Sequence, residues 1–153
     1  MRFAKTLDGL VREAAQARSV DELRQTEALA SAVYFAAWKD RVRIRWVRRD
    51  EGRVPEHWRA FAGRGSPLAN GPRMAGDAIN GLLNLASALL EIETVLALRT
   101  VGLDPGIAFG LHADQRARSS AADDVMEPAR PAAEELVLGL IADRVFPRRA
   151  LRL

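Results

Sequence analysis

Four side chains in the second half of the sequence are of the types that hold divalent metal ions. Glu93 stands in a nearly continuous apolar run, where a carboxylate is costly to bury unless it is paired or binds a metal. His112 ends a short apolar run, and Asp124 and Glu127 are three residues apart, so a helix would place both on one face. Carboxylates with one imidazole suit a divalent ion that activates water or a hydroxyl and stabilises charge on a phosphate.

Each of these residues also fits a purely structural role. A single glutamate in an apolar helix is often an ion-pair partner, here of Arg73 or Arg130. A lone histidine after an apolar run is more often a hydrogen-bonding group than a ligand, and an acidic pair at helical spacing usually faces solvent. The residue pattern alone therefore indicates a helical domain with a candidate acidic metal site.

The elements that must position these side chains are predominantly helical. Alanine and leucine dominate the 153 residues and aromatic residues make up 6%, which favours helices over a β-sandwich. The sequence therefore predicts an all-α fold. Apolar spacing places its helices over Phe3–Arg18, from Ser19 to about Lys39, over Asp77–Val101, and from Ser119 or Ser120 to about Val145, the last divided by Pro128 and Pro131.

Two of the predicted helices carry sharper signals. The run Ser19-Val20-Asp21-Glu22 is a capping box, in which the serine oxygen and the glutamate side chain satisfy exposed backbone amides. The helix Asp77–Val101 has almost no polar face, so we expect it to be buried on most sides. Gly102 is typical of a helix stop, and Asp104-Pro105-Gly106 is typical of a turn.

The segment between the second and third predicted helices is irregular and basic. Arginine alternates with apolar residues over Val42–Trp46, which predicts a strand or an extended basic arm. Residues 49–76 form a long loop rich in Gly, Pro and Arg, and loops of this length are usually functional or disordered. We expect Trp58 and Phe61 to anchor this loop to the core.

Composition excludes several classes of protein. The chain has no cysteine, which excludes disulfides and thiolate metal sites. No apolar run opens the sequence, and the uncharged stretch Ala78–Leu90 is too short to span a membrane, so we expect a soluble, cytoplasmic protein without membrane contact. All cationic residues except Lys5 and Lys39 are arginines, which is compatible with nucleic-acid binding, although a GC-rich genome gives the same bias.

Several motifs follow one another in a fixed order from about Leu10 to Phe146. Together they resemble the CRISPR-associated endonucleases and integrases that acquire spacers, specifically their C-terminal catalytic domain. The motifs are Glu27–Ala30 with Tyr34-Phe35, Gly65–Leu68 with Pro72-Arg73, Asn80–Asn84 with Leu89–Glu93, Gly102–Gly106 with Leu111–Asp114, and Asp124–Pro131.

The resemblance implies roles for individual residues. Glu93, His112 and Glu127 correspond to the ligands of one Mg²⁺ or Mn²⁺ ion, with Asp124 as the neighbouring catalytic acid. Arg64, Arg73 and Arg118 are candidates for contact with DNA phosphates, whereas Arg130 is as compatible with a structural ion pair.

The resemblance also implies an activity and partners. Members of the family are homodimers that bind a second, small CRISPR adaptation protein and carry DNA spacer fragments to the CRISPR repeat. There the 3′-hydroxyl of the fragment attacks a phosphodiester in a metal-dependent transesterification, and the same site cuts DNA as an endonuclease.

The sequence departs from the family pattern in ways that leave two other functions open. We expect residues 1–153 to form a single helical domain without the family's N-terminal β-domain, and Leu85 and Ser87 replace an aromatic pair. One alternative is therefore a truncated, non-catalytic remnant that binds DNA or a partner protein. The other is an unrelated helical interaction module.

Overall fold

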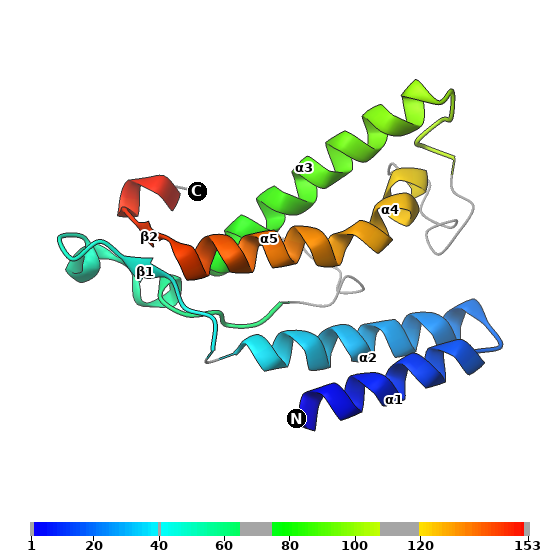
Figure 1. The fold of residues 1–153 in the computed structure, drawn as a ribbon, viewed down its shortest axis with the longest axis horizontal. Coiled ribbons are helices and arrows are strands. Elements are labelled where there is room, and N and C mark those ends of the chain that lie inside the picture. Colours follow the sequence, from blue (N-terminus) through cyan, green and yellow to red (C-terminus); the bar gives the residue numbers. More distant parts are fainter. Residues whose placement is uncertain (1, 40, 65–74, 108–119, 152–153) are drawn as a thin grey trace. The chain divides into compact units, whose positions relative to one another are not determined.

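The chain folds into helices joined by short 3₁₀ turns, as the sequence predicts (Figure 1). A computed structural model describes residues 2–39, 41–64, 75–107 and 120–151. It divides into two compact units, Met1–Asn80 with Val145–Leu153, and Gly81–Arg144. The helices are α1 Arg2–Gln16, α2 Val20–Trp38, α3 Ala78–Thr100, α4 Ser120–Met126 and α5 Arg130–Asp143; the 3₁₀ turns are η1 Glu51–Arg53, η2 Glu56–Trp58, η3 Glu127–Ala129 and η4 Arg148–Leu151.

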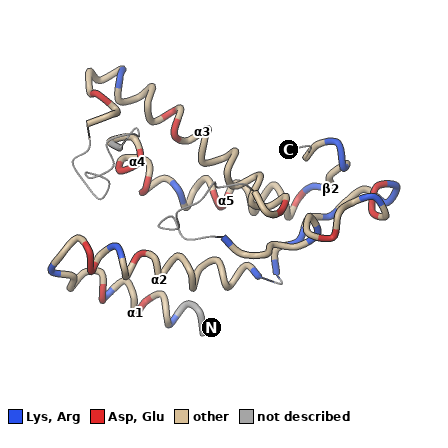
Figure 2. Tube along the Cα trace, turned by 180° about the vertical axis from the view of Figure 1, so that it is seen from behind, with Lys and Arg blue, Asp and Glu red and all other residues tan. Residues whose placement is uncertain are grey.

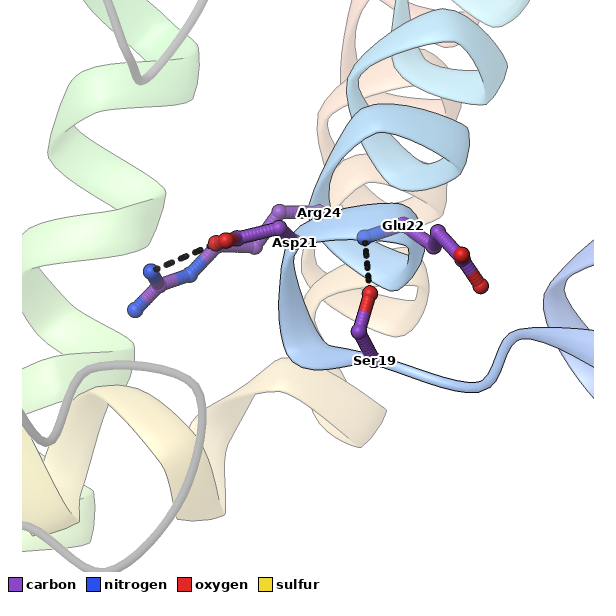
Figure 3. Close-up of polar contacts among 4 residues, drawn as sticks. All are labelled: Ser19, Asp21, Glu22 and Arg24. Atoms are coloured by element: carbon purple, nitrogen blue, oxygen red, sulfur yellow. Dashed lines mark hydrogen bonds and ion pairs between the residues drawn. The ribbon is translucent and has the colours of Figure 1, made fainter.

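Helices α1 and α2 lie side by side as a helical hairpin (Figure 1). The second helix begins at the predicted capping box: Ser19 has extended backbone angles, and its Oγ accepts the amide of Glu22 at 3.1 Å (Figure 3). The Glu22 carboxylate accepts the amide of Arg18 at 2.7 Å. The serine satisfies one amide that a helix start leaves without a partner, and the glutamate binds the residue before the cap; the helix begins at the predicted boundary.

Aromatic side chains form the core of the first unit. Phe35 and Trp38, at the end of α2, pack against Phe61 with ring centroids 5.9 and 5.6 Å away. Phe61 is almost completely buried, which confirms its prediction as an anchor of the long loop. Trp58 is half-buried and stacks on Trp46, with ring centroids 6.2 Å apart. Loop residues 51–58 are thus tied to the core, and the 3₁₀ turns η1 and η2 supply their local structure.

Of the segment Val42–Trp46, predicted as a strand or an extended basic arm, the last two residues form a strand, which pairs with a segment near the C-terminus. Strand β1, Arg45–Trp46, is parallel to β2, Val145–Phe146, with Arg45 opposite Val145 and Trp46 opposite Phe146. The amide of Val47 extends this ladder to the carbonyl of Phe146 at 3.0 Å. Residues a hundred positions apart therefore lie together in the first unit.

The second unit contains most of α3, all of α4 and α5, and the turns between them. Helix α3 ends at Thr100, just before Gly102, which has φ +80°; the amides of Gly102 and Leu103 return to the carbonyls of Arg99 and Leu98. This pattern is a Schellman motif, and it confirms the predicted stop. Pro128 and Pro131 occupy the first turns of η3 and α5, which confirms that the prolines divide the last helical stretch.

The expectation that α3 is buried on most sides is wrong. Its large apolar residues Leu85, Leu89, Ile92 and Leu96 are each more than half exposed. An apolar side chain favours burial, but its sequence does not show which part of a chain will cover it. By length and composition alone α3 could also cross a membrane, although core helices of soluble proteins pass the same test and α3 contains Glu91, Glu93 and Arg99.

Candidate metal and phosphate site

Three of the four predicted site residues belong to the second unit. Glu93 is exposed on α3, Asp124 is half-buried near the end of α4, and Glu127 is half-buried in η3. The sequence suggests that Glu93 is buried and therefore needs a partner. The predicted burial is wrong, because the side chain is exposed to solvent. Its candidacy as a metal ligand depends on its position in the unit.

Small residues allow α4 to approach the helix that bears Glu93. Leu98 of α3 forms a buried cluster with Ala121 and Ala122 of α4, and Val95 packs against this cluster. Both alanines are almost completely buried, so larger side chains at these positions would separate the two helices. The contact lies near the start of α4, one turn before Asp124, and about one turn after Glu93 on α3.

The turn after α3 fixes where α4 begins. Oδ1 of Asp104 accepts the amide of Gly106 at 2.8 Å, which confirms the predicted turn. The carbonyl of Pro105 accepts the amide of Ala121 at 3.0 Å and that of Ala122 at 3.4 Å. The start of α4 is therefore attached to the end of α3, and one carboxylate oxygen of Asp124, Oδ2, is buried.

Glu127 is held by an arginine. Its Oε1 accepts a hydrogen bond from Nε of Arg130 at 2.7 Å, and both side chains are about one-third exposed, 31% and 32%. Arg130 is three positions after Glu127, which places the two side chains one turn apart across the junction of η3 and α5. One interpretation of the sequence makes Arg130 a structural ion-pair partner of Glu93. In the structure Arg130 is an ion-pair partner, but of Glu127.

The remaining predicted residues lie outside the part of the chain that the structure describes. These are His112 of the proposed ligand set and the arginines Arg73 and Arg118. Among residues 2–39, 41–64, 75–107 and 120–151, no group of three or more His, Asp or Glu side chains is arranged to hold a metal ion. The metal site therefore stays a prediction.

Arg64, the third predicted phosphate contact, belongs to a polar network in the first unit. Its guanidinium carbon lies 5.8 Å from the centre of the Phe35 ring, and its Nη1 lies 3.5 Å from Oδ1 of Asn80. The side-chain nitrogen of Asn80, Nδ2, donates to the carbonyl of Gly63 and to Oδ2 of Asp77. These contacts hold the half-buried arginine between α2 and the start of α3.

Asp77 is the centre of this network, and the sequence interpretation did not single it out. It is 1% exposed; its Oδ1 accepts the amide of Asn80 at 2.7 Å, and its Oδ2 accepts the amide of Ala62 at 3.1 Å. An aspartate three residues before the accepted amide is the usual signal of an N-cap. That signal predicts the cap, but not the bond to Ala62, which joins the long loop to α3.

The described residues offer carboxylate oxygens in the second unit and arginine side chains in both units. Carboxylates are the ligands that Mg²⁺ and Mn²⁺ prefer, and arginine binds phosphate through two parallel hydrogen bonds. The residues therefore suit metal-assisted chemistry on a phosphodiester, in which the protein binds and orients while water or a hydroxyl attacks.

Comparison with known proteins identifies similar sequences along most of the chain. Residues 2–150 match the family model of the CRISPR associated protein Cas1. CRISPR-associated endonuclease Cas1 1 of Archaeoglobus fulgidus is 41% identical over 92 residues, which is 60% of this chain and 26% of the relative. The corresponding Cas1 2 protein of Rhodospirillum rubrum is 34% identical over 131 residues, 85% of this chain and 33% of the relative.

A third relative shows the same relationship. CRISPR-associated endonuclease Cas1 3 of Thermus thermophilus is 34% identical over 133 residues, 86% of this chain and 34% of the relative. No solved structure matches the chain. The chain therefore spans between about a quarter and about a third of the length of these curated relatives, while the family match includes every predicted site residue.

Proposed function

The chain belongs to the family of the CRISPR-associated protein Cas1, and from this premise we propose that it is the catalytic part of a metal-dependent DNA endonuclease and integrase. The observation that carries the proposal is the extent of the family match, which runs through Glu93, His112, Asp124 and Glu127. The names of the relatives, which are endonucleases, support it.

In this proposal Glu93, His112 and Glu127 hold one Mg²⁺ or Mn²⁺ ion. Two carboxylates and an imidazole are a donor set that fits such an ion. When bound, the ion lowers the free-energy cost of negative charge on the scissile phosphate. Arg130 orients the Glu127 carboxylate through the 2.7 Å bond to its Oε1.

The remaining side chains position the DNA and move a proton. Asp124, with one buried carboxylate oxygen, orients a ligand or accepts the proton of the attacking group. In integration, the 3′-hydroxyl oxygen of a spacer fragment bonds to a phosphorus of the CRISPR repeat and the original P–O ester bond breaks. In cleavage, water takes the place of the hydroxyl. Arg64, Arg73 and Arg118 contact DNA phosphates.

The proposal includes the family's partners and location. The natural substrates are spacer fragments and the CRISPR repeat, and the second protein is a small CRISPR adaptation protein; the homodimer is a property of the family and not part of the proposal for this chain. The reaction takes place in the cytoplasm.

The second candidate function is a non-catalytic remnant that binds DNA or a partner protein. One observation favours it: the described residues hold no group of three or more His, Asp or Glu side chains arranged to bind a metal ion. Under this alternative the Arg130–Glu127 pair stabilises the junction of η3 and α5 and has no part in catalysis.

Cleavage of branched and single-stranded DNA with Mn²⁺, against an EDTA control, separates the two functions. Alanine at His112 or Glu127 should abolish cleavage and leave most of the DNA affinity, because metal ligands act in the chemical step and phosphate contacts carry the affinity. Wild-type cleavage by His112→Ala would show that the site is assigned to the wrong residues.

A further inference from the structure

Arginines from two distant parts of the chain come together in the first unit, where β1 pairs with β2. We define the basic ribbon as residues 41–53 together with residues 145–151. It contains eight arginines, two acids and no lysine, whereas the whole chain has a net charge of +3. All eight arginines are exposed. Figure 2 shows basic residues along the chain where β1 and β2 lie.

The backbone of β1 separates the charged side of the ribbon from its apolar side. Side chains alternate along an extended segment, so Arg41, Arg43 and Arg45 are exposed while Ile44 and Trp46 are buried. An antiparallel bridge from Arg43 to Ala60 keeps this segment extended. The alternation therefore presents a row of guanidinium groups to solvent, about 7 Å apart.

Pairing of the two chain segments brings further exposed arginines close to β1. The parallel register of β1 with β2 leads directly into η4, which contains Arg148 and Arg149. Oδ2 of Asp50 accepts the backbone amide of Arg148 at 2.9 Å, so one of the two acids of the ribbon is bound to the backbone of η4. The ribbon is consequently a folded surface and not two independent basic tails.

We propose that the basic ribbon binds the phosphate backbone of duplex DNA, separately from the arginines assigned to the candidate site; this inference rests on the proposed function, which makes DNA the substrate. Each DNA strand carries a charge about every 3.4 Å of helix axis, so a row of guanidinium groups meets several phosphates at once. Arginine matches phosphate geometry with paired donors, and its planar group is more weakly hydrated than the ammonium of lysine.

The burial of the aromatic residues indicates a duplex as the occupant. Proteins that bind single strands stack bases on exposed aromatic side chains. In the ribbon Trp46 and Phe146 are 8% and 7% exposed, and they face the core. The ribbon residues themselves offer cations and no exposed aromatic side chain, so the ribbon contacts the backbone and does not read base sequence.

The test is the salt dependence of duplex binding, measured by fluorescence anisotropy in EDTA so that cleavage plays no part. The variant R43Q/R48Q/R149Q removes three charges from the ribbon. Its control, R12Q/R18Q/R99Q, removes three exposed arginines elsewhere. Duplex affinity decreases with salt, and the steepness of log affinity against log salt should be smaller by about two to three in the ribbon variant than in the wild type. The control should keep the wild-type steepness. At low salt the ribbon variant should bind duplex at least about tenfold more weakly than the wild type.

Equal slopes in the two variants, or no duplex binding by the wild-type chain, would overturn the inference. A ribbon variant that loses binding to phosphatidylserine vesicles but keeps its duplex affinity would also overturn it, because the surface would then recognise a membrane. The cleavage assay tests the proposed function independently of this binding assay. A chain that binds duplex through the ribbon but does not cut DNA supports this inference and contradicts the proposed catalytic function.

Discussion

Nε of Arg130 lies 2.7 Å from Oε1 of Glu127, one turn earlier in the chain. Because both side chains are about one-third exposed, solvent screens the pair and it contributes at most about 1 kcal/mol to stability. Its functional consequence is larger, since the same carboxylate is a proposed metal ligand. The guanidinium both orients the carboxylate and competes with a cation for Oε1.

Removal of the charge at Arg130 should therefore tighten metal binding. Arg130→Gln keeps a donor for Glu127 but no cation, and Mn²⁺ affinity, measured by titration calorimetry, should rise by up to about fivefold, the equivalent of a partly exposed ion pair. Arg144→Gln, with the same loss of charge at the C-cap of α5, should leave the affinity unchanged. Equal affinities in Arg130→Gln and the wild type would indicate that Glu127 is not a ligand.

Asp77 should be among the residues most important for stability. Asp77→Ala removes the N-cap of α3 and leaves the amides of Asn80 and Ala62 without their acceptor, so the free energy of unfolding should fall by about 2–3 kcal/mol. Urea denaturation followed by circular dichroism measures this change. Asp8→Ala, at an exposed position of α1, is the control and should change stability little. Similar losses in both variants would refute the role of the network.

Two glycines should respond in opposite directions to the same substitution. Gly102 has φ +80°, where a side chain is strained, so Gly102→Ala should lower the free energy of unfolding by about 1 kcal/mol. Gly9 lies within α1 with no atom close to an added Cβ, and Gly9→Ala should raise it by about 0.5–1 kcal/mol. Thermal unfolding of the two variants provides the comparison, and a stabilising Gly102→Ala would contradict the Schellman stop.

Features of the fold that depend on local signals could be predicted from the sequence. The Ser19 cap, the stop at Gly102 and the division of the last helix at Pro128 act within a few residues of their own position, and all appear in the structure. The spacing of three positions from Glu127 to Arg130 likewise indicates a pair on one helix face.

Features that join distant residues could not be predicted in this way. The pairing of Arg45 with Val145 depends on tertiary structure, because alternation identifies a strand but not its partner. The bond from Ala62 to Asp77 crosses a long loop. Exposure of Leu85 and Leu89 on α3 shows the same limit, since hydrophobicity measures a preference for burial and does not identify the covering surface.

The most direct test of the central claim compares two glutamates of one helix. Wild-type chain, Glu93→Ala and Glu91→Ala are assayed for cleavage of branched and single-stranded DNA with Mn²⁺ and with EDTA, after circular dichroism shows that all three are folded. If Glu93 is a metal ligand, the wild type and Glu91→Ala cut only with Mn²⁺ and Glu93→Ala does not cut. A folded wild type that fails to cut, or cutting by Glu93→Ala at the wild-type rate, would contradict the catalytic account.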